Sequence, residues 1–417
     1  NYTRLSGKSY INFDRLDIRK MQACHVIEKS HHIKFSYVRF REAGNACIQM
    51  AGKRDVDEPN HIYFDHVRIE KCGLLGNNGE GLYISESTPR YGFGGRDIYM
   101  TDSVITETED EPVNVKGGTR RVVITGTVIY NYAPVRQMEK RDPGLFYFRL
   151  SDDPNAGHVL HGNIVVGNKG QGSSKDAAFF LRPGISAFNN LIVGNKMSCV
   201  RGDKGGKFYL NTCVRNVQGF LHPEPVKGSQ KLDINDVRCN IGAGQGNNIP
   251  VDEKMFVDAN QGDFRLRKST ADMAGGCDLN GEMTDIAGRP RQGKWDFGAF
   301  QYGGGTAPPP PPPPPSGLDP VSIGWCMCGC AEGEDGSLGD LHHVEKCRDG
   351  WAACEDDGGV TGLAEHEIGG AGDARERQRV AQVEGDRVLA VMAAQTVALA
   401  FAGFTGLPRA PLRRRTG

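Results

Sequence analysis

The chain has 417 residues, with 50 Lys and Arg against 51 Asp and Glu and a formal net charge of −1 at pH 7. This balance lacks the basic footprint of nucleic-acid binding, so no nucleic-acid partner is expected. The length exceeds that of one ordinary domain, although elongated β folds can reach it.

Short alternating strands recur through the first 300 residues. The stretches INFDRLDI, IKFSYVRF and IYFDHVRI each combine a strand, a polar turn residue and a second strand. Copies begin at residues 11, 33, 62, 98, 122, 159, 186, 208 and 232, so the steps run from 22 to 37 residues. A fixed minimum with insertions indicates a solenoid of stacked coils. Short strands, Asn/Asp/Gly turns and no helical periodicity predict an all-β fold, the right-handed single-stranded parallel β-helix of pectate-lyase-like proteins.

Most coils carry a third short strand, and its alternation defines an inner and an outer face. Aligning ACIQMA, GLYISE, PVNVKG, LFYFRL and AFFLRP puts apolar residues on the inner face. One outer column then contains Gln49, Tyr83, Asn114, Tyr147 and Phe180. The next contains Ala51, Ser85, Lys116, Arg149 and Arg182. We expect a cationic ladder beside a partly aromatic one, a surface suited to the carboxylates of an acidic sugar chain.

An unusual concentration of acids, ETEDEPVNVK, precedes the strand that carries Lys116. Glu109 and Glu111 enter this strand, and Asn77 and Glu80 lie at the matching corner one coil earlier. Carboxylate and amide oxygens gathered at a turn are ligands that suit Ca²⁺. A solvated acidic turn with a surface ion pair is the simpler alternative.

The same residues resemble motifs of the β-helical polysaccharide lyase family that includes alginate lyases and chondroitinase B. NNGEGLYI resembles the first motif of this family, ETEDEPVNVKGG keeps the E-x-E-x4-K spacing of the second, and LFYFRLSD matches the arginine of the third. The resemblance implies that Asn77, Glu109 and Glu111 hold Ca²⁺, that Lys116 is the general base, and that Arg149 assists at the reacting uronate. Leu150 stands where the family has a histidine, and Tyr83 where it has an arginine.

The cysteines fall into two groups. Seven of the 12 lie in the first 300 residues, and Cys47, Cys199 and Cys213 occupy apolar strand positions. We interpret these three as small buried residues. The other five crowd between Cys326 and Cys354, in a spacing that fits no common zinc module.

A run of eight prolines ends the repeat region. We predict a β-helix domain over residues 1–302, a Gly/Pro-rich linker over 303–320 and a Cys-containing tail over 321–417. The segment 388–407 has no charged residue and is followed by arginines, so the tail is interpreted as a weak membrane-sorting segment or as poorly ordered sequence. The closing segment FVDANQGDFRLRKSTADMAGGCDLN resembles that of secreted bacterial β-helix proteins, which predicts a secreted or envelope location.

These patterns lead to two hypotheses. The first is a monomeric lyase that cleaves a uronate-containing acidic polysaccharide by Ca²⁺-assisted β-elimination. Lys116 and Arg149 would be catalytic, with Tyr83, Asn114, Tyr147, Phe180 and Arg182 binding substrate. The second is a non-catalytic β-helix that binds glycans or builds a surface structure, which needs the cationic ladder but not the metal.

Overall fold

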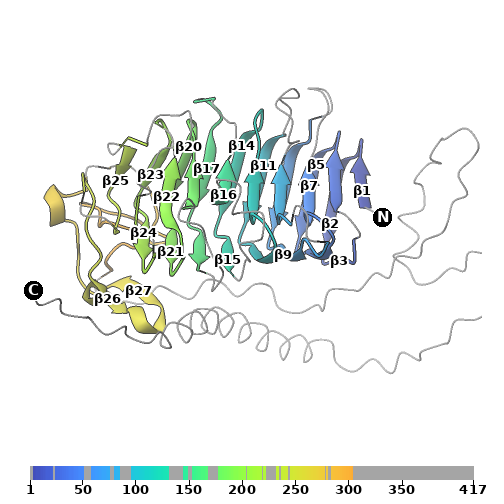
Figure 1. Cartoon of the computed structure of the whole chain (residues 1–417). Coiled ribbons are helices and arrows are strands. Elements are labelled where there is room, and N and C mark those ends of the chain that lie inside the picture. Colours follow the sequence, from blue (N-terminus) through green and yellow to red (C-terminus); the bar gives the residue numbers. More distant parts are fainter. Residues whose placement is uncertain are drawn as a thin grey trace, which may run out of the picture.

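A computed structural model describes residues 3–303, apart from 22–23, 51–57, 76–78, 85–94, 131–143, 149–152, 168–176, 203, 218, 222–231, 234–235, 243–244, 278 and 280–282. Parallel strands stack into one elongated solenoid, in which colour progresses along the axis with the sequence (Figure 1). This arrangement is a parallel β-helix, as the repeats predict. The predicted linker beyond Gly303 and the predicted tail, including 388–407, lie outside the described residues. No helix within the described ranges is long and apolar enough to cross a membrane.

Three parallel sheets form the walls of the solenoid. The first sheet contains β1 (Thr3–Ser6), β4 (His25–Glu28), β7 (Ile48–Met50), β10 (Leu82–Ile84), β13 (Val113–Val115), β16 (Gly144–Phe148), β19 (Ala177–Leu181) and β22 (Ser198–Gly202). The second contains β2 (Ser9–Asp14), β5 (His31–Ser36), β8 (Asn60–Asp65), β11 (Arg96–Thr101), β14 (Arg120–Thr125), β17 (His158–His161), β20 (Ile185–Phe188), β23 (Lys207–Tyr209) and β25 (Val237–Arg238). The third contains β3 (Asp17–Arg19), β6 (Arg39–Ala43), β9 (Arg68–Cys72), β12 (Val104–Thr108), β15 (Val128–Tyr130), β18 (Ile164–Val166), β21 (Leu191–Val193) and β24 (Thr212–Val214).

A sharp turn of one residue joins the second sheet to the third in each coil. The turn residue has a left-handed conformation, with φ of 53° at Arg15, 54° at Tyr37 and 53° at Asn189. Such a residue reverses the side-chain alternation and redirects the strand within one peptide step. The sequence predicts five polar residues at this corner. Four of them end the strand just before the turn, namely Asp14, Ser36, Asp65 and Thr125, whereas the fifth, Asn189, forms the turn itself.

The interior is a continuous apolar core. Phe13, Phe35 and Phe64 stack along the axis with ring centroids 4.9 and 5.3 Å apart, because the strands that carry them pair in register. Each coil alone exposes one edge of this core to water, so the stacking of neighbouring coils is what buries it.

Disulfides connect parts of the solenoid that alternation alone does not relate. Cys47 pairs with Cys72 of the next coil, and Cys199 pairs with Cys213 across one coil. A third disulfide, Cys239–Cys277, attaches the closing segment. The interpretation of Cys47, Cys199 and Cys213 as merely small buried residues was therefore wrong, because their strand positions bring each thiol next to another.

Buried asparagines form a row of hydrogen-bonded side chains along the solenoid axis, which we call the asparagine ladder. It consists of Asn163, Asn190, Asn211, Asn240 and Asn248, all 2 % exposed or less. The Oδ1 of each later member accepts hydrogen bonds from the backbone N–H and the Nδ2 of the member before it, at 2.8 to 3.1 Å. Because Asn carries both donors and an acceptor, the same side chain satisfies its neighbours at each step of the ladder from Asn163 to Asn248.

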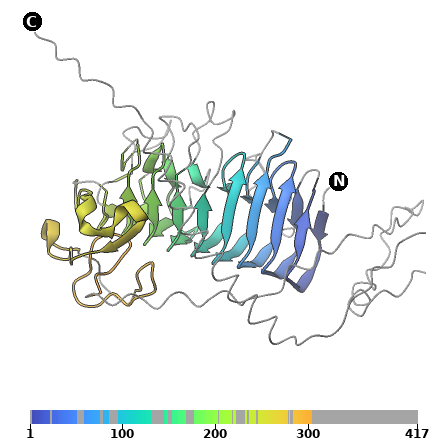
Figure 2. The same ribbon diagram turned by 90° about the horizontal axis from the view of Figure 1, so that it is seen from below.

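The closing segment folds back over the end of the solenoid. It includes the 3-10 turns η4 (Glu253–Met255), η5 (Ala259–Gln261) and η6 (Met273–Gly275) and the antiparallel pair β26 (Phe256–Asp258) and β27 (Asp263–Leu266). Figure 2 shows its yellow and orange ribbon against the last coils. Phe297 and Trp295 pack with Ile241 and Leu210 in a second apolar cluster, so this segment covers a core that would otherwise end in water.

Because the protein contains buried histidines, we expect its folded state to lose stability at acidic pH. Burial lowers the pKa of His158 to about 4, below the value of 6.5 in the unfolded chain. The folded state thus binds fewer protons between these pH values, so the stabilisation is complete above pH 6.5 and is lost as the pH falls toward 4. About 2.5 pKa units correspond to roughly 3 kcal/mol.

We expect His158→Asn to reduce this loss, because an amide oxygen can accept the hydrogen bond that Val122 N–H donates to His158 Nδ1 at 3.2 Å. Urea midpoints at pH 7.5, 6 and 5 measure the effect, with the more exposed His61→Asn as the control. An identical pH slope in wild type and His158→Asn would contradict the prediction.

Candidate functional site

The predicted site lies on the outer face of the first sheet, between β10 and β13. Tyr83 pairs with Asn114 in register, flanked by the pairs Leu82–Val113 and Ile84–Val115. The pairing continues from Gln49 through Tyr83 and Asn114 to Tyr147 and Phe180. The outer column predicted from alternation is therefore confirmed at the level of the backbone.

Three carboxylates meet at the corner that precedes these strands. Glu80 comes just before β10, while Asp110 and Glu111 lie in the turn before β13, and one oxygen of each lies within 4.8 Å of the others. All three are 5 % exposed or less. Asn114 donates from Nδ2 to Glu111 Oε2 at 3.2 Å and to Glu80 Oε1 at 3.4 Å. We call Glu80, Asp110 and Glu111 the carboxylate cluster.

The cluster is electrostatically strained when all its members are ionised. The pKa of Glu111 is raised well above its usual value, first by burial and then by the adjacent Asp110 and Glu80, while Lys116 opposes the shift. Two unit charges about 4.8 Å apart repel by roughly 3 to 4 kcal/mol at an effective dielectric constant near 20. Such a cluster needs a proton or a cation to be stable at neutral pH.

The donor set fits a calcium ion. Ca²⁺ binds oxygen ligands at about 2.3–2.6 Å, so two ligands on opposite sides of the ion are separated by up to about 5 Å. The oxygen atoms of the carboxylate cluster lie within 4.8 Å of one another, which is inside this reach. Asn114 Oδ1 is a further buried oxygen, and it has no hydrogen-bond partner in the part of the chain that the structure describes.

Lys116 lies one residue beyond β13 on the same face. It is 5 % exposed, and its Nζ lies 5.4 Å from the centre of the Tyr83 ring. A lysine held over an aromatic face gains cation–π attraction while its ammonium remains close to the carboxylate cluster. The site therefore combines a buried amine with buried acids on neighbouring coils.

The structure brings together four of the residues that the sequence predicts here: Tyr83, Glu111, Asn114 and Lys116. Glu109 is placed elsewhere. Its side chain is exposed. Its Cβ packs so close to Gly79 that a Cβ added at Gly79 would lie only 2.6 Å from it. Asp110 occupies the position in the cluster that spacing assigns to Glu109, because the turn points the side chain of Glu109 outward.

The other predicted residues are placed less fully. Asn77 and Arg149 lie outside the described residues, and Tyr147 is placed through its backbone in β16. Phe180 is on the outer column of β19 but is only 2 % exposed, and the guanidinium carbon of Arg182 lies 5.6 Å from the centre of its ring. Phe180 is thus a covered support for Arg182 rather than an open aromatic platform.

The ligand set that the sequence predicts for the cation is Asn77, Glu109 and Glu111, so it lacks Asp110, and Glu80 is placed at the corner without being assigned as a ligand. Glu80 lies in the stretch that resembles the first lyase motif, so its position one coil before the acids was a usable signal. Asp110 had no such signal, because a run of three acids does not reveal which one faces inward at a turn.

The fold and the carboxylate cluster beside Lys116 define a parallel β-helix with a candidate cation and proton-transfer site. No protein-family model matches the sequence, and no curated protein matches it. Among solved structures, the comparison finds an alginate lyase from Paenibacillus sp. str. FPU-7, with a TM-score of 0.35 and 13 % identity over 60 % of this chain and 75 % of that one. A likeness this distant carries no conclusion about activity.

Proposed function

We propose that the protein is a polysaccharide lyase that cleaves a uronate-containing acidic polysaccharide by β-elimination. The observation that carries this proposal is the carboxylate cluster beside the buried Lys116, on the outer face of the first sheet of the solenoid. A long ridge formed by successive coils suits an extended sugar chain better than a small ligand. The three disulfides support a location outside the reducing cytosol, where such polysaccharides occur.

In the proposed reaction Lys116 Nζ, as the free amine, removes the proton from C5 of the uronate. The electron pair left at C5 forms the C4–C5 double bond, and the bond from C4 to the glycosidic oxygen breaks. That oxygen leaves with a proton taken from solvent or from the protonated lysine. Ca²⁺ held by Glu80, Asp110 and Glu111 would neutralise the uronate carboxylate and acidify the C5 proton.

The proposal is tested by the ultraviolet absorbance of unsaturated uronate products. We expect at least one of alginate, pectate, dermatan and chondroitin to give a rising absorbance with Ca²⁺, and the rise to stop in excess chelator. No rise with any of the four in the presence of Ca²⁺ would remove the main support for the lyase.

The two neighbouring acids supply a matched pair of variants. Asp110→Asn should lower turnover about 10- to 100-fold by weakening the cation site, and added Ca²⁺ should restore part of it. Glu109→Gln should remain near wild type, since that side chain points into solvent. If Glu109→Gln lost turnover and Asp110→Asn did not, the cation would be bound by Glu109, as the motif spacing predicts, and not by Asp110.

A further inference from the structure

A pocket of about 250 Å³ lies on a different face from the candidate site, between the second sheet and the closing segment. Its lining residues are Ser186, Lys207, Tyr209, Asp236, Arg238, Leu279, Met283 and Trp295. It lies on β20, β23 and β25, whereas the candidate site is on β10 and β13 of the first sheet. The strand of the first sheet that directly precedes β23 is β22, which lies three coils beyond β13. The pocket and the candidate site are therefore about 14 Å apart along the axis of the solenoid.

The strands supply one wall of this pocket through their register. Ser186 pairs with Lys207 on one outer column, and Phe188, Tyr209 and Arg238 follow one another on the next. The rings of Phe188 and Tyr209 stack with centroids 5.0 Å apart and planes 4° from parallel. Tyr209 is thereby held rigidly, and burial raises the pKa of its hydroxyl, which stays neutral and able to donate a hydrogen bond.

The closing segment supplies the other wall, and it is firmly attached. Arg291, 4 % exposed, donates from Nη2 to Asn189 Oδ1 and to the carbonyl of Gly298, both at 2.7 Å. Ala299 N–H donates to Thr212 Oγ1 at 2.9 Å, and the Cys239–Cys277 disulfide adds a covalent link. The pocket is therefore preformed, which lowers the entropy that a ligand must overcome.

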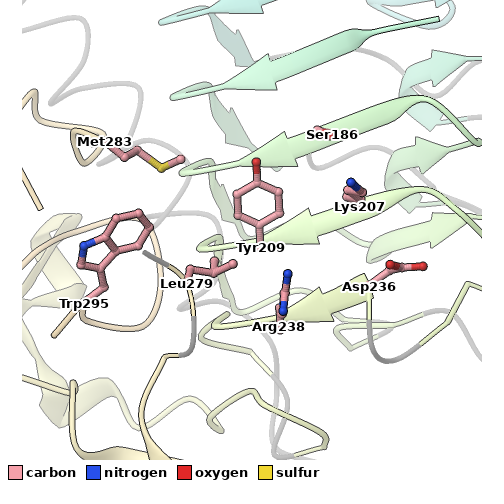
Figure 3. Close-up of a pocket in the computed structure, with 8 residues that line it drawn as sticks. All are labelled: Ser186, Lys207, Tyr209, Asp236, Arg238, Leu279, Met283 and Trp295. Carbon is pink, nitrogen blue, oxygen red and sulfur yellow. The ribbon is translucent and has the colours of Figure 1, made fainter. Parts of the chain in front are cut away.

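The lining is divided into an apolar and a charged end. Figure 3 shows Met283, Leu279 and Trp295 on one side of Tyr209, with Lys207 and Asp236 on the other. Across the described ranges, Lys207 and Asp236 form no ion pair with each other or with another residue. Arg238 also lines the pocket, so a ligand in it meets both cationic and carboxylate side chains.

We propose that this pocket binds one anionic pyranose unit, a uronate, separately from the site at Lys116. The C–H face of the sugar ring packs against the apolar end, the carboxylate meets Lys207 and Arg238, and hydroxyls meet Asp236 and the Tyr209 hydroxyl. The volume lies just below the roughly 300–1,000 Å³ typical of drug-sized ligands, so it accommodates one ring rather than an oligosaccharide. This inference does not rest on lyase chemistry.

The test compares sugars that differ only at C6. D-Glucuronate and D-galacturonate are titrated into the full chain against D-glucose and D-galactose, with saturation-transfer NMR and calorimetry as readouts. We expect the uronates to bind with millimolar affinity and the neutral sugars at least ~10-fold more weakly, since the neutral sugars lack the charge-assisted hydrogen bond of the carboxylate. The uronate could be the end unit of a polysaccharide chain or a free monosaccharide, and digalacturonate distinguishes these two ligands. Retained affinity for digalacturonate indicates a chain end, whereas lost affinity indicates a free monosaccharide.

Variants locate the binding. Lys207→Ala, at an exposed side chain, should weaken uronate binding at least ~10-fold without changing the urea midpoint, and Lys254→Ala should do neither. Lys116→Met should leave monosaccharide binding intact, so a failed lyase assay does not decide this proposal. Absence of uronate binding, equal binding of the neutral sugars, or binding unaffected by Lys207→Ala would each overturn it.

Discussion

Replacement of Lys116 by methionine is expected to reduce turnover of the polysaccharide substrate at least ~10²- to 10⁴-fold, the usual contribution of a general base. Methionine keeps most of the length and the contact with the Tyr83 ring, where Lys116 Nζ lies 5.4 Å from the ring centre, so the fold should be retained. The measurement is the initial rate of ultraviolet absorbance increase. Lys268→Met, at an exposed lysine of the closing segment, is the matched control.

A second substitution at the same position distinguishes the lyase from the glycan-binding alternative. Lys116→Arg keeps the positive charge but removes a group that can act as a base near neutral pH. A lyase should lose turnover in Lys116→Arg while retaining affinity for the polysaccharide. If the protein only binds glycans, Lys116→Arg should behave as wild type, and Lys116→Met should weaken binding about as much as loss of Arg182 does.

Asn190→Ala is expected to lower the free energy of unfolding by about 3 kcal/mol or more. Asn190 Oδ1 accepts from the backbone N–H of Asn163 at 2.9 Å and from its Nδ2 at 3.0 Å, and Asn190 Nδ2 donates to the carbonyl of Leu160 at 3.0 Å. The substitution leaves all these groups buried without that partner, and each costs about 1–3 kcal/mol. No water is expected to replace the amide within a close-packed interior.

The loss is measured by urea unfolding at pH 7.5, well above the range in which the buried histidines titrate. Asn155→Ala is the control, because that side chain is exposed and the change should remain within about 0.5 kcal/mol. Equal midpoints for Asn190→Ala and Asn155→Ala would mean that the asparagine ladder orders the turns without stabilising them.

Much of the fold could be predicted from the sequence because its signals are local and periodic. Period-two alternation fixes which residues of a strand face the core, so the column from Gln49 to Phe180 follows from pattern alone. The corners were predictable to within one residue, because a polar residue ends the strand just before most of them, but the left-handed turn residue itself is Arg15 or Tyr37 as readily as Asn189. The asparagine ladder also carries a sequence signal, a recurring Asn after the corner, but none of its members is among the turn residues that the sequence predicts.

Two features of the site depended on non-local geometry. The exchange of Glu109 for Asp110 results from a bend in the turn before β13, where Gly79 of the preceding coil leaves room for the Glu109 side chain. The disulfides likewise join Cys47 to Cys72, 25 residues apart, through the stacking of coils of unequal length. Neither partner can be read from a spacing, because insertions shift the spacing without moving the strands.

The sequence by itself determined the solenoid, its inward and outward faces, and the placement of Asn114 and Lys116 on one face, since each follows from side-chain alternation along a strand. The tertiary structure alone decided which acids meet, that Phe180 is covered, and that Tyr209, Lys207 and Trp295 enclose a pocket. The physical reason is that a strand's own pattern sets the direction of its side chains. Contacts between coils and with the returning closing segment depend on turns and insertions, whose paths are set by packing across the whole molecule.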